Sequence, residues 1–600
     1  MNSPTLFLRL ALLAVAPFLV IRSELTAQST PAVETEKKAT AVLRQPELQP
    51  LVFIKIASIQ AIQDMVNTNF SEYPELGKKL AQSLTMAGLV LGDPSLSTLV
   101  PDSDINFIVL NDLSRPEPFI IVIKLTPDSP IRESLKKQGL KLSEVGPFTY
   151  IGKNPEILKQ STLSKGVYAI ALKKRATAIE IGTWPNRLAG QILQNKTLFA
   201  QSAAKDSEAL RTPEAQANIE GFIDVLCSEM STADSAMMGL DLSNGSIKLQ
   251  SLITAKAETP LHRFLSQSVG GPVNGAQFLA QKGMISAVAR IDPVASADYC
   301  QTSLQNFSKA STGKLQMLFQ RMIETVQQGW KINDGSYAMT VEMQGKGEIP
   351  AATMAMVTKL DRAAYLRELE QFYTKDLNNF YQALGDLFKQ AMVRTEFAVK
   401  KDAYSVQKTP VDIVDMTMVS DPAFAKRAEA EALMKSSEES GNTAEHDAAV
   451  KLKEELDAAG SQEQRIVQTM HYAIVDNLIL GSPTREALQP IVRLVSEGKP
   501  AANSLADTMS LEPGVAMRFA VHLEELLLAS ANAMEKENPE QANKLRDAMA
   551  DLQLDPITGL VTVGNGKAGA KLKIPLSAIL KIIEKSKPAA AKPDESAPAQ

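Results

Sequence analysis

The stretch LILGSPTREALQPIV, residues 478–492, has a parallel 299 residues earlier in IEIGTWPNRLAGQIL, residues 179–193. Aligned without a gap, both contain a short apolar run, a glycine (Gly481 or Gly182), and then a serine or threonine. A proline-containing turn and an amphipathic helical pattern follow in each. A unit that occurs twice at this distance indicates an internally repeated chain.

Four further stretches join a β-branched run to a helical pattern through a Ser, Thr, Asp or Pro corner. The oxygen of such a corner side chain accepts hydrogen bonds from the free N–H groups of the first helical turn, and proline fits the first helical position. The pattern therefore predicts strands that lead directly into capped helices. These stretches are residues 51–66, 119–135, 284–300 and 354–369.

Two such units, followed by the glycine-containing unit, occur in the same order in each half of the chain. The segment SVGGPVNGAQ, residues 268–277, separates the halves and has the composition of a Gly-rich hinge. We therefore predict two pseudo-repeats, residues 49–267 and 278–586.

The turn signals predict the direction of the strands. Asn244-Gly245 and Asn565-Gly566 are two-residue hairpin signals between apolar runs, and strands joined by such tight turns are antiparallel. We expect an α+β fold, with a mostly antiparallel sheet packed by amphipathic helices in each repeat.

Helical periodicity is clear in the second half. Residues 314–330 and 377–393 carry apolar side chains at the spacing of one buried helix face. Residues 420–465 change to Ala, Glu, Lys and Ser, which predicts a charged helical insertion in the second half only. This insertion is either a docking arm or a solvated segment without a partner.

The two ends differ from the rest of the chain. Residues 1–27 contain a basic residue, a short uncharged apolar run and a small-residue cleavage site, which predicts a secretory signal peptide; an uncleaved membrane anchor is the alternative. Residues 28–48 are a polar linker, and residues 587–600 form an Ala/Pro tail predicted to be disordered. The sequence thus favours an exported protein, periplasmic or extracellular, without a transmembrane segment in the mature chain.

Composition excludes some partners. The chain has 600 residues, a formal net charge of −5 and 5% aromatic residues, without a long basic cluster, so no nucleic-acid partner is expected. Cys227 and Cys300 are the two cysteines, and in an oxidising compartment they form one disulfide or none.

Motifs for catalysis and metal binding are missing from the sequence. The four histidines are scattered singly, without the spacing of a zinc-binding pair, and no G-x-S-x-G nucleophile motif occurs. We therefore predict no catalytic residue, no metal site and no cofactor, and an enzyme is the less favoured class.

Methionine is abundant, with 22 residues. Met354 and Met356, like Met416 and Met418, are two positions apart, so each pair faces one side of its strand. Thioether side chains suit a Cu(I) site or an adaptable pocket for an apolar ligand. The alternative is that they fill gaps in an ordinary core.

The segment NLILGSPTREAL (residues 477–488), followed by ANSLADTMSL (residues 502–511), resembles segments of large secreted bacterial proteins. These proteins belong to a domain-of-unknown-function family with repeated strand-helix units. The resemblance implies an exported α+β protein without an assigned reaction.

Three functional hypotheses follow from these observations. The first is an exported non-enzymatic protein that binds a partner protein or an apolar ligand in the cell envelope or outside the cell. The alternative is an exported hydrolase with its site in the cleft between the two repeats. The third is a passive structural component of a surface assembly.

Overall fold

The computed structural model describes residues 48–585 with gaps. The gaps are most of 71–97, residues 101, 112–116, 206–212, 282, 332, 343–350, 380 and 382–392, most of 421–441, and residues 459–463, 536–537 and 550–553. The predicted signal peptide, almost all of the linker and the C-terminal tail lie outside the described residues.

The chain divides into two compact units. One contains residues 1–184 and 238–245, and the other contains residues 185–237 and 246–600. The predicted hinge, residues 268–277, lies inside the second unit, so these units are not the predicted repeats. The repeat boundaries stay a prediction.

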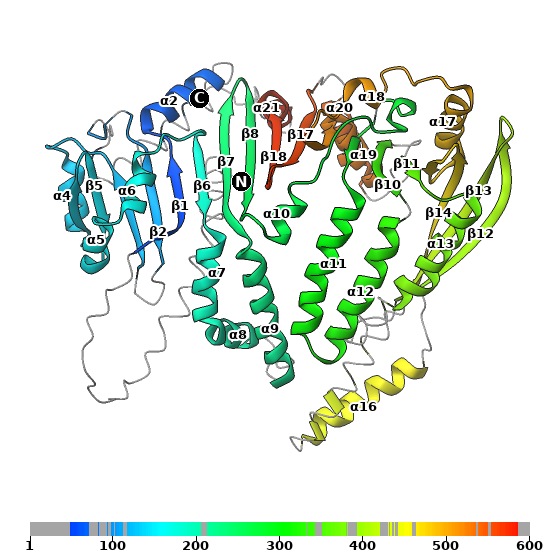
Figure 1. Ribbon diagram of the computed structural model, residues 1–600, viewed down its shortest axis with the longest axis horizontal. Helices are drawn as coiled ribbons and strands as arrows, with labels where there is room; N and C mark the ends of the chain where they lie inside the picture. The colour runs from blue at the N-terminus through cyan, green and yellow to red at the C-terminus, as the bar shows by residue number, and fades with distance from the viewer. Residues whose placement is uncertain are drawn as a thin grey trace, which may run out of the picture. The chain divides into compact units, whose positions relative to one another are not determined.

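The described strands of the first unit form an antiparallel sheet in the order β4-β5-β3-β2-β1-β6, of which Figure 1 labels β5, β2, β1 and β6. Helices pack on both faces of this sheet. On one face, α4 packs with the odd-numbered side chains of β3, such as Ile123. On the other face, Leu158 of α5 lies beside Ile120 and Gly152. The strands are β1 (Pro50–Ile56), β2 (Ile105–Leu110), β3 (Phe119–Ile123), β4 (Lys141–Val145), β5 (Phe148–Gly152) and β6 (Ile179–Thr183). The helices are α2 (Ile59–Asn69), α4 (Pro130–Lys137), α5 (Pro155–Ser161) and α6 (Lys165–Leu172).

The described strands of the second unit form an antiparallel sheet in the order β8-β18-β17-β16-β9-β10-β11-β15-β14-β13-β12. The strands are β8 (Ser246–Ala255), β9 (Ile285–Arg290), β10 (Asn333–Glu342), β11 (Ala351–Thr358), β12 (Val393–Val406), β13 (Thr409–Ser420), β14 (Gln464–Val475), β15 (Leu478–Ser482), β16 (Val515–Val521), β17 (Ile557–Gly564) and β18 (Lys567–Pro575). Strand β7 (Ala233–Ser243) contributes residues to both units.

The helices of the second unit fall into several groups. Helices α9 (Pro213–Met230), α11 (Pro293–Ala310) and α12 (Gly313–Lys331) lie side by side and are joined by the ring contacts Phe222–Phe307 and Phe307–Phe319 (Figure 1). The others are α7 (Pro185–Gln194), α8 (Lys196–Lys205), α10 (Pro260–Phe264), η2 (Ala276–Phe278), α13 (Arg362–Gln371), the π-helical turn η3 (Phe372–Leu377), α16 (Thr443–Ala458), α17 (Arg485–Glu497), α18 (Leu505–Thr508), α19 (Leu523–Met534), α20 (Pro539–Met549) and α21 (Leu576–Lys585).

Alternating side chains of the second sheet supply two separate cores. Leu478 and Leu480 of β15 face α17 and pack with Leu488 and Val492 of that helix. Ile479, between them in sequence, faces α13 on the other side of the sheet. The sheet is therefore buried on both faces around β15, which explains why this strand is apolar without alternation.

The predicted strand-helix corners are confirmed. Each of the four stretches contains a strand followed within a few residues by a helix. The side chains of Ser58, Asp292 and Asp361 accept hydrogen bonds from the first turns of α2, α11 and α13. At the fourth corner, Ser129 precedes α4 without such a bond, and its hydroxyl lies 2.7 Å from that of Thr98.

The antiparallel α+β prediction is also confirmed. Asn565 and Gly566 both have positive φ, 52° and 71°, and connect β17 to β18 as a two-residue turn. The predicted helix at 314–330 is α12, whereas the one at 377–393 lies largely outside the described residues. Of the predicted insertion 420–465, α16 is a described helix, and much of the remainder lies outside the described part of the chain.

Among the described residues, the model contains no helix with the length and apolar character that crossing a membrane requires.

Candidate functional site: a two-arginine groove

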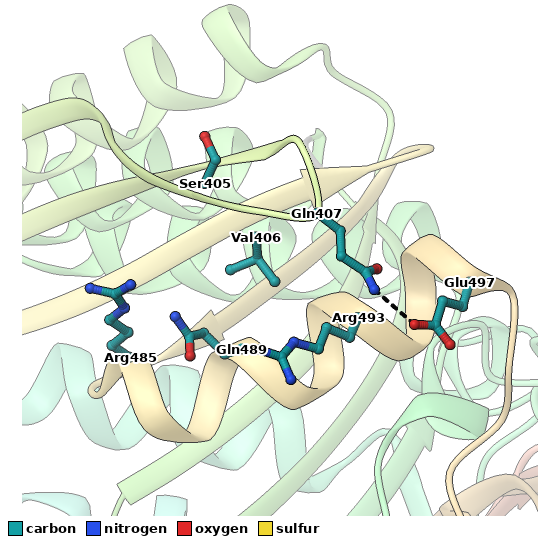
Figure 2. Close-up of a pocket in the computed structure, with 7 residues that line it drawn as sticks. All are labelled: Ser405, Val406, Gln407, Arg485, Gln489, Arg493 and Glu497. Carbon is teal, nitrogen blue, oxygen red and sulfur yellow. Dashed lines mark hydrogen bonds between the residues drawn. The ribbon is translucent and has the colours of Figure 1, made fainter.

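An open groove lies between helix α17 and the end of strand β12 (Figure 2). Its volume is about 530 Å³. Four side chains on α17, each four residues from the next, form one wall: Arg485, Gln489, Arg493 and Glu497. Ser405, Val406 and Gln407 form the other wall. The lining is mainly polar, so the groove suits a charged or hydrogen-bonding ligand better than an apolar one.

Helix α17 is held firmly beneath this groove. The side chain of Thr484 caps its first turn by accepting from the backbone N–H of Ala487, and Gly498, with φ 63°, ends the helix. Leu488 and Val492 are fully buried against the sheet. Since these side chains fix the apolar face against the sheet, the four groove residues are held on the adjoining face of the helix.

Arg485 is oriented by two neighbours. Its guanidinium carbon lies 4.4 Å from the centre of the Tyr404 ring, which is a cation–π contact. With its amide oxygen turned toward Arg485, Gln489 accepts hydrogen bonds from Nε at 2.7 Å and Nη2 at 3.2 Å. The Tyr404 hydroxyl lies 3.1 Å from Nδ1 of His471, which fixes the ring in turn.

Burial affects the two groups behind Arg485. It raises the pKa of Tyr404 and lowers the pKa of His471, so the phenol and the uncharged imidazole are favoured at neutral pH. His471 lies opposite Ser482 in the β14–β15 pair. Ser482 is fully buried, however, and its hydroxyl lies 3.2 Å from that of Thr353. This histidine–serine pair therefore presents no nucleophile to the groove.

The far end of the groove is closed by Glu497. Its carboxylate accepts a hydrogen bond from Nε2 of Gln407 at 2.7 Å and pairs with Lys499 at 2.9 Å. The hydrogen bond from Gln407, followed by Lys499, lowers the pKa of Glu497. Gln407 and Lys408 form the β12–β13 turn with φ of 47° and 71°, which is uncommon for residues other than glycine. This left-handed turn is the element that carries Gln407 toward α17.

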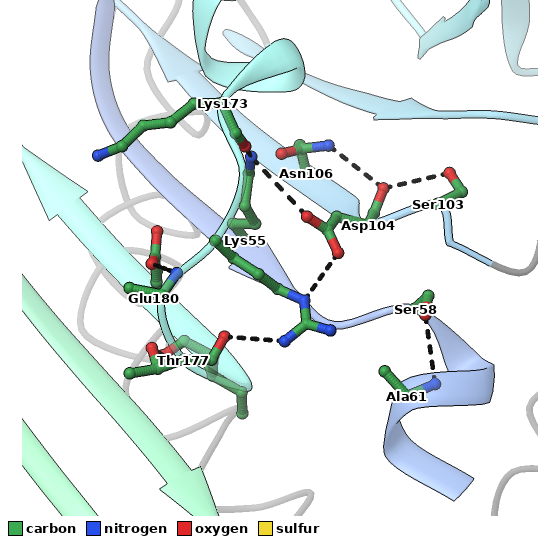
Figure 3. A network of polar contacts seen from close by, with 12 residues as sticks. Lys55, Ser58, Ala61, Ser103, Asp104, Asn106, Lys173, Thr177 and Glu180 are labelled. Carbon is green, nitrogen blue, oxygen red and sulfur yellow. Dashed lines mark hydrogen bonds and ion pairs between the residues drawn. The ribbon is translucent and has the colours of Figure 1, made fainter. Parts of the chain in front are cut away.

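A second polar cluster lies within the first unit (Figure 3). Lys55 on β1 lies directly opposite Glu180 on β6 and Asn106 on β2, so the three side chains form a row across one face of the sheet. Their exposed fractions are 1%, 4% and 1% respectively. Buried charges of this kind are rare and require partners.

The partners of Lys55 come from the end of helix α6. Its Nζ donates to the backbone carbonyl of Ile170 at 2.8 Å and to that of Lys173, and it lies 3.9 Å from Oδ2 of Asp104. Asp104 also pairs with Nε of Arg175 at 2.8 Å. Burial lowers the pKa of Lys55, an effect that Asp104 partly opposes. The ammonium group thus stabilises the carbonyl end of α6.

Glu180 holds the segment that follows α6. One carboxylate oxygen accepts from the backbone N–H of Ala176, while the other, like Oδ1 of Asn106, is buried without a hydrogen-bond partner among the described residues. The row Glu180–Lys55–Asn106 therefore holds the connection between α6 and β6 against the sheet. We call these three residues the clasp.

The structure separates the methionines predicted as a ligand site. Met356 lies opposite Ile479, which lies opposite Ile474 on β14, whereas Met416 lies opposite Gln468 on the same strand. Ile474 and Gln468 are six positions apart on β14, which corresponds to about 20 Å, so the two pairs do not share one ion.

The methionine side chains also differ in burial. Met416 is buried and Met356 half-buried in the core that faces α13, and Met354 packs across Gly481. Met418 is 37% exposed. Ligand binding at these four residues stays a prediction.

Cys227 and Cys300 are free thiols in this structure, the first buried and the second half-buried. Burial raises the pKa of both. Among the described residues, no group of three or more His, Cys, Asp or Glu side chains is arranged to hold a metal ion.

Sequence reasoning did not single out the groove or the clasp. One signal was the polar row at four-residue spacing in the amphipathic helix 485–497. Another was the single lysine inside the apolar run LVFIKI, residues 51–56. Comparison of the chain with protein-family models, with curated proteins and with solved structures gives no match.

Proposed function

We propose that this chain is an exported, non-enzymatic binding protein that holds a partner in the groove between α17 and the β12–β13 turn. The observation that carries the proposal is the groove itself, an open polar surface in which Arg485 is oriented by Tyr404 and Gln489. A rigid side chain loses little conformational entropy on binding, which favours recognition. Export is supported by the predicted signal peptide, residues 1–27.

We also propose that the chain contains two copies of one α+β module. In the first unit, β1 lies between β2 and β6, and β2 is followed across the sheet by β3 and the β4–β5 hairpin. In the second unit, β9 lies between β10 and β16, and β10 is followed by β11 and the β14–β15 hairpin. The same neighbours occur in the same chain order, which supports duplication.

This correspondence matches β15 with β5. Each is the second strand of its hairpin and leads into a helix capped by a side chain, that of Thr484 in α17 and that of Asn154 in α5. It therefore differs from the alignment of residues 179–193 with 478–492, because β6 pairs with β1 and corresponds to β16.

The pairing of β8 with β18 supports the same proposal. The turns Asn244-Gly245 and Asn565-Gly566 are 321 residues apart, and this offset relates Ser246 to Lys567 and Thr254 to Pro575. In the sheet, Ser246 lies opposite Pro575 and Thr254 lies opposite Lys567. The register is therefore self-complementary, as in the interface between two identical copies related by a two-fold axis.

Under this correspondence, the groove belongs to the second copy alone. The β12–β13 hairpin is an addition at the edge of the second sheet, next to β14, and the described strands of the first sheet end at β4. Because one wall of the groove is the end of this added hairpin, we assign the groove to the second copy.

A panel of chemically different probes tests the binding function. Acidic, neutral and basic peptides, an anionic and a neutral oligosaccharide and a fatty acid are titrated calorimetrically into the full chain. A Gln489→Trp variant fills the groove, and Gln468→Trp, at an exposed position on β14, is the matched control. We expect at least one probe to bind the wild type and the control but not the filled variant, and to be recovered chemically unchanged.

Two results contradict the proposal. If no probe distinguishes Gln489→Trp from the control, the groove is not a binding site. If a bound probe is cleaved, the protein is an enzyme. Export is tested by determining the N-terminal residue of the mature protein, and a chain that retains residues 1–27 in the cytosol refutes it.

A further inference from the structure

We infer that the occupant of the groove is an extended acidic segment of a partner polypeptide, with two carboxylates that pair with Arg485 and Arg493. This inference rests on the proposed binding function and names the chemistry of the partner.

The spacing of the two arginines sets the spacing of the carboxylates. Arg485 and Arg493 are eight residues apart on α17, which corresponds to about 12 Å along the helix axis. In an extended peptide, acidic residues four positions apart lie about 13 Å from each other. Their side chains also point to the same side, because side chains alternate along a strand.

Both guanidinium groups are suited to carboxylates. The planar fork of arginine donates two parallel hydrogen bonds to a carboxylate, and Arg485 is already oriented by Tyr404 and Gln489. In the described part of the chain, no hydrogen bond or ion pair joins Arg493 to another residue, although it lines the groove (Figure 2). The charge of Arg493 acts on Glu497, one turn further along α17, but its hydrogen-bond donors stay accessible to a ligand.

The remaining lining residues limit the number of carboxylates to two. Glu497 lies one turn beyond Arg493 and is held as an anion by Gln407 and Lys499. A third carboxylate at this end would meet like charge, which disfavours a uniformly charged polyanion.

The neutral lining favours a peptide over a sugar polymer. Gln407 and Gln489 offer amide groups that match the alternating donors and acceptors of a peptide backbone. No aromatic residue is among the seven lining residues, and the ring of Tyr404 is covered by Arg485, so a sugar ring finds no face to stack on.

Calorimetric titration of the full chain with short serine–glycine peptides tests the inference. One peptide carries two glutamates four residues apart, a second carries them two residues apart, and a third has glutamines in their place. Inorganic phosphate and a sulfated oligosaccharide are the competing anions. We expect the first peptide to bind most tightly, and its affinity to fall as added salt screens the charges.

Substitution of the arginines provides the second arm. Arg493→Gln is expected to weaken binding of the first peptide by about tenfold, as is usual for loss of a charge-assisted contact. Arg465→Gln, which removes an exposed arginine of β14 outside the groove, is expected to leave binding unchanged. Equal thermal unfolding of both variants and the wild type shows that folding is intact.

Three outcomes overturn the inference. They are equal binding of the glutamine peptide, unchanged affinity in Arg493→Gln, and tighter binding of phosphate or the sulfated oligosaccharide than of any peptide. If a non-acidic probe still binds in a groove-dependent way, only this inference fails. If nothing distinguishes Gln489→Trp from its control, the proposed function fails as well.

Discussion

Replacing Lys55 with methionine removes a buried ammonium group and keeps a side chain of similar length. The Lys55 side chain is 1% exposed and donates to the carbonyls of Ile170 and Lys173. The substitution leaves these carbonyls without their donor and leaves Glu180 buried without the opposite charge beside it.

The expected loss follows from these contacts. Each buried carbonyl that loses its donor costs about 1–3 kcal/mol. Removing one member of a buried charge pair costs about 3–5 kcal/mol in total, because the other charge stays desolvated. We therefore expect Lys55→Met to lower the free energy of unfolding of the first unit by ~3–5 kcal/mol.

The proposed duplication supplies a matched second variant. At the position that corresponds to the row Glu180–Lys55–Asn106, the second copy has Met517, Ala289 and Tyr337, which lie opposite one another across β16, β9 and β10. A double variant, Lys55→Met with Glu180→Met, imitates this less polar row. We expect it to lose less stability than Lys55→Met alone, since the orphaned carboxylate is also removed.

Chemical denaturation followed by tryptophan fluorescence measures these changes. Trp184 contacts Phe53 at a ring-centre distance of 5.8 Å and so reports on the sheet of the first unit. Lys136→Met is the control, because Lys136 and Glu133 form an exposed pair on α4 that contributes less than ~1 kcal/mol. If Lys55→Met loses no more than this control, or if the double variant is less stable than the single one, the clasp interpretation is refuted.

Three further predictions concern a glycine, the groove and a thiol. Gly335→Ala is expected to lower the free energy of unfolding by ~1–3 kcal/mol, because residue 335 has a φ of 85° and an added Cβ would meet the backbone oxygen of Ile291. Gly190→Ala is the control: the space around Gly190 is open, so we expect no loss. Thermal denaturation compares the two variants. Gln407→Ala removes the hydrogen bond that favours the charged form of Glu497, so we expect the lowered pKa of Glu497 to rise toward 4.5. An NMR titration measures this pKa, and an unchanged value contradicts the contact. Cys227 is buried with a raised pKa, so we expect slow reaction with a thiol reagent until the chain unfolds; rapid native reaction disproves this burial.

Local signals predicted the strand-helix corners. The cap residues Ser58, Asp292 and Asp361 act within a few residues of their own position, so their effect is visible without knowledge of the remainder of the chain. The hairpin at Asn565-Gly566 is equally local, because the turn itself requires positive φ at two successive residues.

Contacts between distant segments could not be predicted in this way. Gln407 and Glu497 are 90 residues apart, and Lys55 and Ile170 are 115 residues apart. The spacing of Met354 and Met356 predicts that they share a face, but the distance from Met416 depends on which strands lie between β11 and β13.

By itself, the sequence determined the element types, the antiparallel pairing of adjacent strands and the lack of familiar catalytic motifs. These properties depend on side-chain period, turn residues and capping, all of which act over a few residues. The tertiary structure alone decided the strand order, the groove beside α17 and the burial of Lys55. Strand order depends on which apolar faces cover one another, and that balance of burial and chain entropy involves the whole chain.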